Sequence, residues 1–227
     1  MDLLFPRRCP ICDRVQPLGE IVCPGCARGL RPVASPFCRK CGKALSDSTE
    51  EYCSDCRGQE HLFIEGRALW EYPDVRQSVY RFKYGGRKEY GEFYGRELAR
   101  HLGNTMLSWK PDALVPVPLH RARKRMRGYN QAEMLARETG KRLGIPVESH
   151  LVARIKKTTP QKLLSPSMRQ NNLKRAFKIT KNVVKLNTII IVDDIYTTGS
   201  TVDAMSAALQ EAGIKHVYFI TLAIGRG

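Results

Sequence analysis

The chain has 227 residues and a formal net charge of +16. That length suits one ordinary domain with a small additional segment. No apolar run reaches the ~20 residues of a membrane-spanning helix, and the first residues lead into no signal-peptide pattern. We therefore expect no membrane span and a cytoplasmic location. The charge is uneven, because residues 1–61 carry a net +1 and residues 62–227 a net +15.

All eight cysteines lie before residue 57 and form four Cys-x-x-Cys pairs. Such a turn directs two thiolates at one ion, and two turns complete a tetrahedral site. A disulfide framework is the competing interpretation, but it would go with secretion, and redox pairs do not explain the fourfold repetition. We predict two structural zinc ions, held by Cys9, Cys12, Cys23, Cys26, Cys38, Cys41, Cys53 and Cys56.

The cysteine-rich segment has few large apolar residues, so bound metal must replace the missing core. The simplest arrangement pairs the ligands in sequence, with the first four cysteines on one ion and the last four on the other. A cross-braced arrangement of the first with the third pair stays open. The sequence thus predicts a small zinc-ribbon domain over residues 1–61 and a second domain over residues 62–227.

From residue 62 onward, strand patterns alternate with helical patterns, which is typical of an α/β fold with a mostly parallel sheet flanked by helices. The expected elements are a strand or hairpin arm over 66–72 ended by Pro73, a short helix with Val75, Val79 and Phe82 on one face, a longer helix to about Leu107, a buried strand over 113–118, a helix over 134–143, a strand region over 146–155 and a closing strand over 217–224.

A basic run follows the strand that ends near Pro118. Such a run is usually a solvated surface, but this one leaves the end of a strand where a sheet's ligand binds. Tyr84 and Tyr129 are the few aromatic residues near basic runs, so phosphate contacts would dominate any nucleic-acid binding. The candidate nucleic-acid residues are Arg121, Arg123, Lys124, Arg125, Arg127, Lys156, Lys157 and Lys162.

Residues 149–192 contain no acidic residue and ten Lys or Arg. Within this interval, residues 156–167 are polar and contain two prolines. A long loop of this kind in a compact domain is typically functional or disordered. We expect a mobile lid over residues 156–167.

The most informative stretch runs from Thr188 to Thr201. Four consecutive β-branched residues, Ile189 to Val192, predict a buried parallel strand that ends at Asp193 and Asp194. A loop rich in hydroxyl groups and a helical pattern follow, and a loop running into a helix presents N–H groups that suit a phosphate. The expected phosphate-loop residues are Thr197, Thr198, Gly199, Ser200 and Thr201.

Asp193 and Asp194 require a different ligand, because carboxylates repel phosphate. Their natural targets beside a phosphate loop are ribose hydroxyl groups or a Mg²⁺ ion. Phosphate, sugar hydroxyl groups and metal together describe 5-phosphoribosyl 1-pyrophosphate (PRPP). The stretch resembles the PRPP-binding signature of type I phosphoribosyltransferases, and it lacks the Gly-Lys-Ser/Thr ending of a Walker loop.

The order of the motifs along the whole chain resembles the ComF family, including ComFC-type competence proteins and GntX-like relatives. These motifs are the cysteine-rich segment, Val115-Pro-Val-Pro118, Arg125 to Gln131, the Thr158 to Asn172 segment, and the PRPP signature. The resemblance implies a type I phosphoribosyltransferase-like fold and a role in natural DNA uptake beside a DNA-translocating helicase. It also implies a pyrophosphate loop at Pro118, Leu119, His120 and Arg121.

Two functions follow from these patterns. In the first, a competence protein binds PRPP or a related phosphoribosyl ligand, and its basic surface binds single-stranded DNA. In the second, an active phosphoribosyltransferase transfers ribose 5-phosphate from Mg²⁺-PRPP to an unknown acceptor. No general base can be identified from the sequence, so we favour the first.

Overall fold

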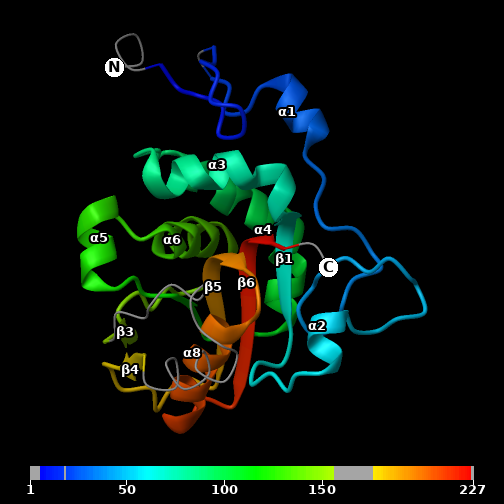
Figure 1. Ribbon diagram of the computed structural model, residues 1–227. Helices are drawn as coiled ribbons and strands as arrows, with labels where there is room; N and C mark the ends of the chain where they lie inside the picture. The colour runs from blue at the N-terminus through cyan, green and yellow to red at the C-terminus, as the bar shows by residue number, and fades with distance from the viewer. Residues whose placement is uncertain (1–5, 18, 156–175, 226–227) are drawn as a thin grey trace.

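The computed structural model describes residues 6–17, 19–155 and 176–225, and the expected lid over 156–167 lies outside them. Figure 1 shows a central sheet with helices on both faces. In chain order the elements are α1 (Pro24–Gly29), α2 (Ser54–Arg57), β1 (Gly66–Glu71), α3 (Tyr72–Tyr84), α4 (Tyr90–Ser108), β2 (Ala113–Pro116), α5 (Arg121–Arg127), α6 (Gln131–Leu143), β3 (Val152–Arg154), β4 (Phe177–Ile179), β5 (Thr188–Tyr196), α8 (Ser200–Glu211) and β6 (His216–Ile224).

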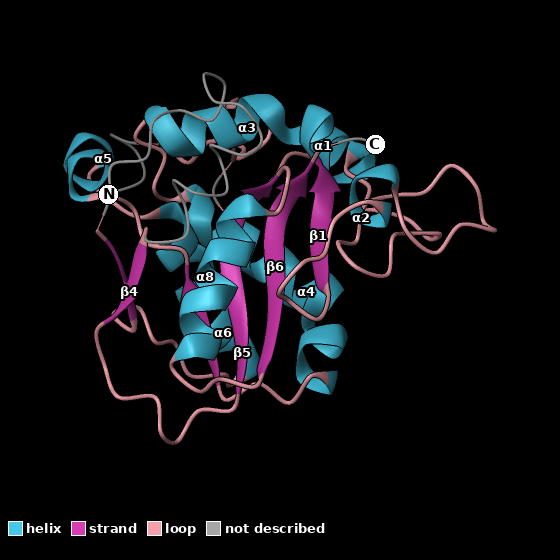
Figure 2. Cartoon of the chain, turned by 60° about the horizontal axis from the view of Figure 1, so that its bottom comes forward, coloured by secondary structure: helices cyan, strands magenta, loops and turns pink. Residues whose placement is uncertain are grey.

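The main sheet has the strand order β1-β6-β5-β2, and all of its strand pairs are parallel. The expected α/β fold with a mostly parallel sheet is therefore confirmed. In Figure 2 the arrowheads of β1 and β6 point to the end of the molecule where α3 and α5 lie. Because the strands are parallel, their carboxyl ends form one edge, where ligands of such sheets bind.

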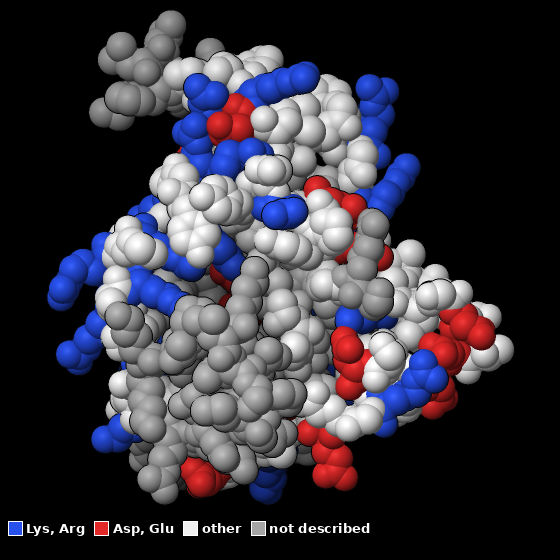
Figure 3. All heavy atoms as spheres, in the orientation of Figure 1, with Lys and Arg blue, Asp and Glu red and all other residues white. Residues whose placement is uncertain are grey.

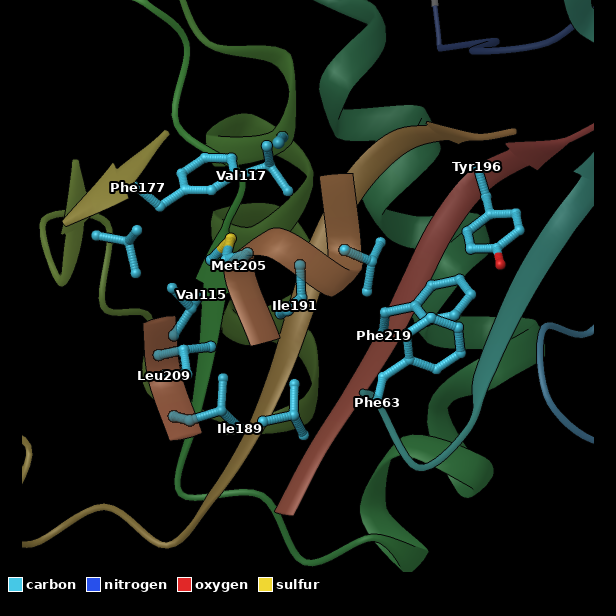
Figure 4. Packing of buried hydrophobic residues seen from close by; sticks show 14 of the residues in the cluster. Phe63, Val115, Val117, Phe177, Ile189, Ile191, Tyr196, Met205, Leu209 and Phe219 are labelled. Carbon is cyan, nitrogen blue, oxygen red and sulfur yellow. The ribbon is translucent and has the colours of Figure 1, made fainter. Parts of the chain in front are cut away.

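Alternating residues of β5 face two separate cores. Ile189 and Ile191 belong to a core with Met205 and Leu209 of α8, as Figure 4 shows. Ile190 and Val192 belong to the opposite core, which α3, α4 and α6 cover. An uninterrupted β-branched run is what a strand buried on both faces requires.

Several expected boundaries were wrong in detail. The first strand ends at Glu71 rather than Tyr72, because Pro73 occupies the first turn of α3 instead of ending the strand region. The strand expected over 113–118 ends at Pro116, and that over 146–155 contains only β3, which pairs with β4 in a second, antiparallel sheet. The central strand does not end at Asp193 and Asp194 but continues to Tyr196.

The cysteine-rich segment packs on the sheet domain at two places. The part around Cys9 to Cys26, here called the first ribbon, lies along α3, where Arg81 donates a hydrogen bond to the carbonyl of Ile11. The part around Cys38 to Cys56, the second ribbon, lies beside β1, and three of its cysteines share a core with Phe63 and Phe219. The division of the chain at residue 61 stays a prediction, and these contacts cross it.

Candidate functional site

The eight cysteines form two clusters of four. Cys9, Cys12, Cys23 and Cys26 form the first, and Cys38, Cys41, Cys53 and Cys56 form the second, with the sulfur atoms of each cluster within 4.8 Å of one another. The pairing is thus sequential and not cross-braced. None of the eight cysteines forms a disulfide bond, which contradicts the disulfide framework.

The spacing of the sulfur atoms fits zinc. Two sulfur atoms at the corners of a tetrahedron with Zn–S bonds of about 2.3 Å lie roughly 3.8 Å apart. The Cys12 and Cys23 sulfur atoms are 3.8 Å apart, and those of Cys41 and Cys53 are 3.7 Å apart. Both clusters therefore have the ligand set and the dimensions of a structural zinc site with four cysteine ligands.

Asp193 and Asp194 lie within β5, beyond the end of the neighbouring strand. The ladder between β2 and β5 ends at Pro116 and Val192, whereas β6 continues to pair with β5 as far as Tyr196. The end of β2 therefore leaves one edge of β5 uncovered at the two aspartates. Both side chains are only partly exposed, at the carboxyl edge of the sheet.

Two protein cations, Lys83 and Arg154, influence this acidic pair. The Lys83 ammonium, at the end of α3, lies 2.9 Å from Asp194 Oδ1, and these side chains are only 16% and 14% exposed. Burial raises the pKa of Asp193 to about 7, and the charge of Asp194 adds to this effect, whereas Lys83 and Arg154 oppose it. Sequence reasoning did not identify Lys83 or Arg154 as members of this site.

The expected phosphate loop joins β5 to α8. Thr197 and Thr198 are exposed, and Thr198 Oγ1 lies 3.0 Å from Ser200 Oγ. Ser200 and Thr201 are already helical, so the loop is shorter than expected. Gly199 precedes the helix with φ at +77°, and no side chain caps the helix there, so the first amide groups of α8 face the loop.

Two residues that the sequence did not identify, Tyr196 and His61, pack against this loop. A Cβ atom added to Gly199 would lie 2.6 Å from the Tyr196 hydroxyl oxygen and 2.8 Å from His61 Cε1. His61 Nδ1 is 2.8 Å from Asp203 Oδ2 in the first turn of α8, and the His61 side chain is 1% exposed. The required glycine was the only signal in the sequence for this close packing.

The loop expected to hold pyrophosphate lies next to the acidic pair. Val117 donates a backbone hydrogen bond of 2.9 Å to Val192, and Asn130 Nδ2 donates one of 3.0 Å to the Val117 carbonyl. Pro118, Leu119 and His120 follow, partly exposed, and His120 Nδ1 accepts a hydrogen bond from Ala122 N at the start of α5. The loop is thus fixed at both ends.

The basic run forms α5, on one side of the molecule, and Figure 3 shows Lys and Arg gathered there. Arg121, Lys124 and Arg125 are exposed, whereas Arg123 and Arg127 are partly exposed. Arg123 is close enough to Arg154 to lower the pKa of that guanidinium, an effect secondary to burial. Lys156, Lys157 and Lys162 lie outside the described residues.

Comparison with known proteins agrees with this architecture. Residues 1–57 match the double zinc ribbon domain, and residues 91–226 match the phosphoribosyl transferase domain. The "Competence protein F" of Haemophilus influenzae is 32% identical over 213 residues, which cover 89% of this chain and 90% of that protein. The chain belongs to the ComF family.

Two further ComF-family relatives match over most of their length. The "DNA utilization protein YhgH" of Escherichia coli K12 is 30% identical over 220 residues, which cover 95% of this chain and 96% of that protein. The "Competence protein ComFC" of Bacillus subtilis is 28% identical over 205 residues, which cover 86% and 80%. The expected ComF-family membership, with a zinc ribbon before a phosphoribosyltransferase domain, is confirmed.

No helix among the described parts of the chain is long and apolar enough to cross a membrane.

Proposed function

We propose that this ComF-family protein acts in natural DNA uptake, binding PRPP or a related phosphoribosyl ligand at the carboxyl edge of its sheet and single-stranded DNA on the surface around α5. The observation that carries the proposal is the position of α5. This helix starts directly after the loop beside Asp193 and carries basic residues away from the site. The names of the relatives support a role in DNA uptake.

The proposed binding of a phosphoribosyl ligand is supported by three groups at the carboxyl edge of the sheet. The start of α8 offers amide and hydroxyl groups to a 5′-phosphate, and the acidic pair offers carboxylates to the ribose hydroxyl groups. The family resemblance assigns pyrophosphate to the 118–121 loop, which follows a residue bonded to Val192 beside the acidic pair. Lys83 and Arg154 add positive charge to a site with two aspartates. An anionic ligand with a neutral sugar in its middle satisfies all of these groups.

The Mg²⁺ that accompanies PRPP has a limited choice of ligands here. Asp194 is already paired with Lys83 at 2.9 Å, which leaves less of its charge for a metal. Mg²⁺ keeps several waters and binds substrate phosphates together with one or two carboxylates. We therefore assign the metal to the pyrophosphate of the ligand, with Asp193 as the protein carboxylate available to it and Asp194 as the ribose-binding group.

The proposed binding of single-stranded DNA is supported by the sign and position of the protein's net charge. The excess of +15 lies after residue 61, and five basic residues stand between 121 and 127. The cysteines form two zinc-type clusters rather than disulfide bonds, which is typical of a reducing compartment and supports the expected cytoplasmic location. The resemblance to the ComF family is what supports a DNA-translocating helicase as partner.

A fluorescence-anisotropy titration with a labelled oligo-dT at several salt concentrations tests the DNA part. The log–log slope should be about −0.7 per phosphate neutralised, and the triple variant Arg123→Ala/Lys124→Ala/Arg125→Ala should reduce its magnitude by roughly 2 if all three contact phosphates. The matched control is Arg100→Ala/Lys141→Ala/Lys215→Ala, which removes the same charge from exposed positions away from α5.

The control variant should keep the wild-type slope. Binding that is absent at low salt would reject DNA as a ligand. A slope that responds equally to both triple variants would show that the charge acts only through the net field of the protein.

The second candidate function is a phosphoribosyltransferase reaction with an unknown acceptor. One observation favours it, namely a carboxyl group whose pKa is raised to about 7 beside the expected ribose position. Such a group can accept a proton from an attacking nucleophile near neutral pH. Incubation with Mg²⁺-PRPP and candidate nucleobases, with pyrophosphate release as the readout, tests this reaction. Pyrophosphate release that depends on an added acceptor would establish it.

A further inference from the structure

Two tyrosine rings lie together on the outer face of α3. Tyr80 and Tyr84 are 59% and 54% exposed, and they are one helical turn apart. Their ring centroids are 5.1 Å apart, with 47° between the ring planes. Among the described residues the only other large exposed aromatic side chain is Tyr52, on the second ribbon. Two of three exposed rings therefore share one small area.

The guanidinium of Arg127 joins this pair to α5. Its carbon lies 4.7 Å from the centroid of the Tyr84 ring, and its Nη2 donates a hydrogen bond of 2.9 Å to the Tyr84 hydroxyl. A second hydrogen bond, of 2.9 Å to Gln131 Oε1, fixes the other side of the guanidinium. We call these three residues, Tyr80, Tyr84 and Arg127, the aromatic platform. The platform combines two solvent-exposed rings with a positive charge whose position is fixed by hydrogen bonds.

The aromatic platform stands between the two sites proposed above. Lys83, next to Tyr84 in sequence, turns inward to Asp194 at the carboxyl edge. Arg127 is the last residue of α5 and brings the basic run to the outer side of Tyr84. A strand whose phosphates lie along α5 would therefore reach the platform at the mouth of the phosphoribosyl site.

We propose that the aromatic platform formed by Tyr80, Tyr84 and Arg127 is a base-stacking site for single-stranded DNA. Every nucleobase offers a flat face to an aromatic ring, so such a site binds without strong sequence preference. The guanidinium plane over Tyr84 adds stacking and charge at the same point. In a duplex the bases already stack on one another, so exposed rings favour unpaired strands. This inference rests on the proposed binding of single-stranded DNA.

Isolated apolar side chains on a surface are common and carry no meaning alone. Three features separate this pair from that background: the two rings are adjacent, the charge over one of them is fixed by two hydrogen bonds, and the neighbouring helix is basic. Tyr129, the other aromatic residue near the basic run, is half-buried and donates its hydroxyl hydrogen to the Phe82 carbonyl. Tyr129 is therefore no part of the platform, although it lies near the basic run in the sequence.

The test compares two probes of equal charge. One is a labelled oligo-dT, and the other is an abasic oligonucleotide of the same length, which keeps the phosphates and lacks the bases. Wild-type protein should bind oligo-dT at least about fivefold more tightly than the abasic probe. The variant Tyr80→Ala/Tyr84→Ala should bind both probes equally, with an unchanged salt slope. Thermal unfolding checks that the variant is folded.

Two controls isolate the rings. Tyr80→Phe/Tyr84→Phe keeps both rings and should keep the preference for oligo-dT, and Tyr52→Ala removes an exposed ring from a place with acidic neighbours and should also leave it intact. Preference that persists in the double alanine variant would overturn the platform while leaving DNA binding in place. Wild-type protein that binds neither probe at low salt would instead overturn the proposed DNA binding, and the platform with it.

Discussion

Asp194→Asn should weaken PRPP binding by about tenfold to about 150-fold. The carboxylate is only 14% exposed and lies at the uncovered edge of β5, so a bound ribose hydroxyl would donate to a charged acceptor with little competition from water. A hydrogen bond to a charged group contributes about 1.5–3 kcal/mol, which corresponds to that range of affinity. Isothermal titration with PRPP and Mg²⁺ at pH 8 measures the loss. Glu211→Gln, an exposed acid at the far end of α8, is the charge-matched control.

The ion pair with Lys83 makes this prediction sharper. Lys83→Met removes the cation that faces Asp194, so it should lower both PRPP affinity and the melting temperature. The melting temperature of the double variant Lys83→Met/Asp194→Asn should be higher than the sum of the two single shifts predicts, because no unpaired charge then remains at the site. Coupling of about 0.5–3 kcal/mol is typical of residues in direct contact. A folded Asp194→Asn variant with wild-type affinity for PRPP would refute the assignment of the acidic pair.

Three other predictions follow from individual features of the structure. The pKa of Asp193 is raised from 3.8 to about 7, so the folded protein keeps a proton that the unfolded chain releases. The free energy of unfolding should therefore fall as the pH rises from about 4 to about 7. Urea denaturation at several pH values measures this trend, which should be weaker in the Asp193→Asn variant. Gly199→Ala should weaken PRPP binding in an isothermal titration. Gly144→Ala should not, because Gly144 also has a positive φ, of +70°, but no atom lies within 4 Å of the added Cβ. Equal effects of the two substitutions would leave only backbone strain as the cause. Elemental analysis should find two zinc ions per chain. A strong chelator should lower the melting temperature of the sheet domain as well as of residues 1–61, because three zinc-binding cysteines belong to the core of the sheet. An unchanged melting temperature of the sheet domain in the presence of the chelator would contradict this.

Local patterns in the sequence predicted the parts of the fold that depend on nearby residues. A β-branched run and a helical stripe identify β5 and α8 because side-chain periodicity follows directly from backbone geometry. Four Cys-x-x-Cys turns likewise identify two zinc clusters, since each turn brings its own two ligands together. The short strand β4, by contrast, has only three residues, and its pairing with β3 depends on a partner more than twenty residues away.

Contacts between distant residues were not visible in the sequence. Lys83 directly follows Phe82, the last apolar residue of the expected short helix, and nothing local distinguishes it from a solvated lysine. Its contact with Asp194 arises because α3 ends over the carboxyl edge of the sheet. Tyr84 and Tyr129 both lie near basic residues in the sequence, yet only Tyr84 is exposed. Tyr84 is the last residue of α3 and Tyr129 lies in the turn between α5 and α6, so their exposure is decided by packing against distant residues, which local sequence patterns do not reveal.

The linker after the second ribbon binds the carboxylate of Asp203 at the phosphate loop. Asp203 lies in the first turn of α8, where a carboxylate stabilises the helix but repels a phosphate bound at the same end. His61 Nδ1 lies 2.8 Å from Asp203 Oδ2, and the Leu62 amide donates to Oδ1 at 2.9 Å, so both oxygens face the linker. Phe63 then packs edge-on against Tyr196, the last residue of β5. The ribbon core and the support of the loop are therefore one continuous structure, and this is the physical reason to expect that loss of the second zinc ion also weakens phosphoribosyl binding.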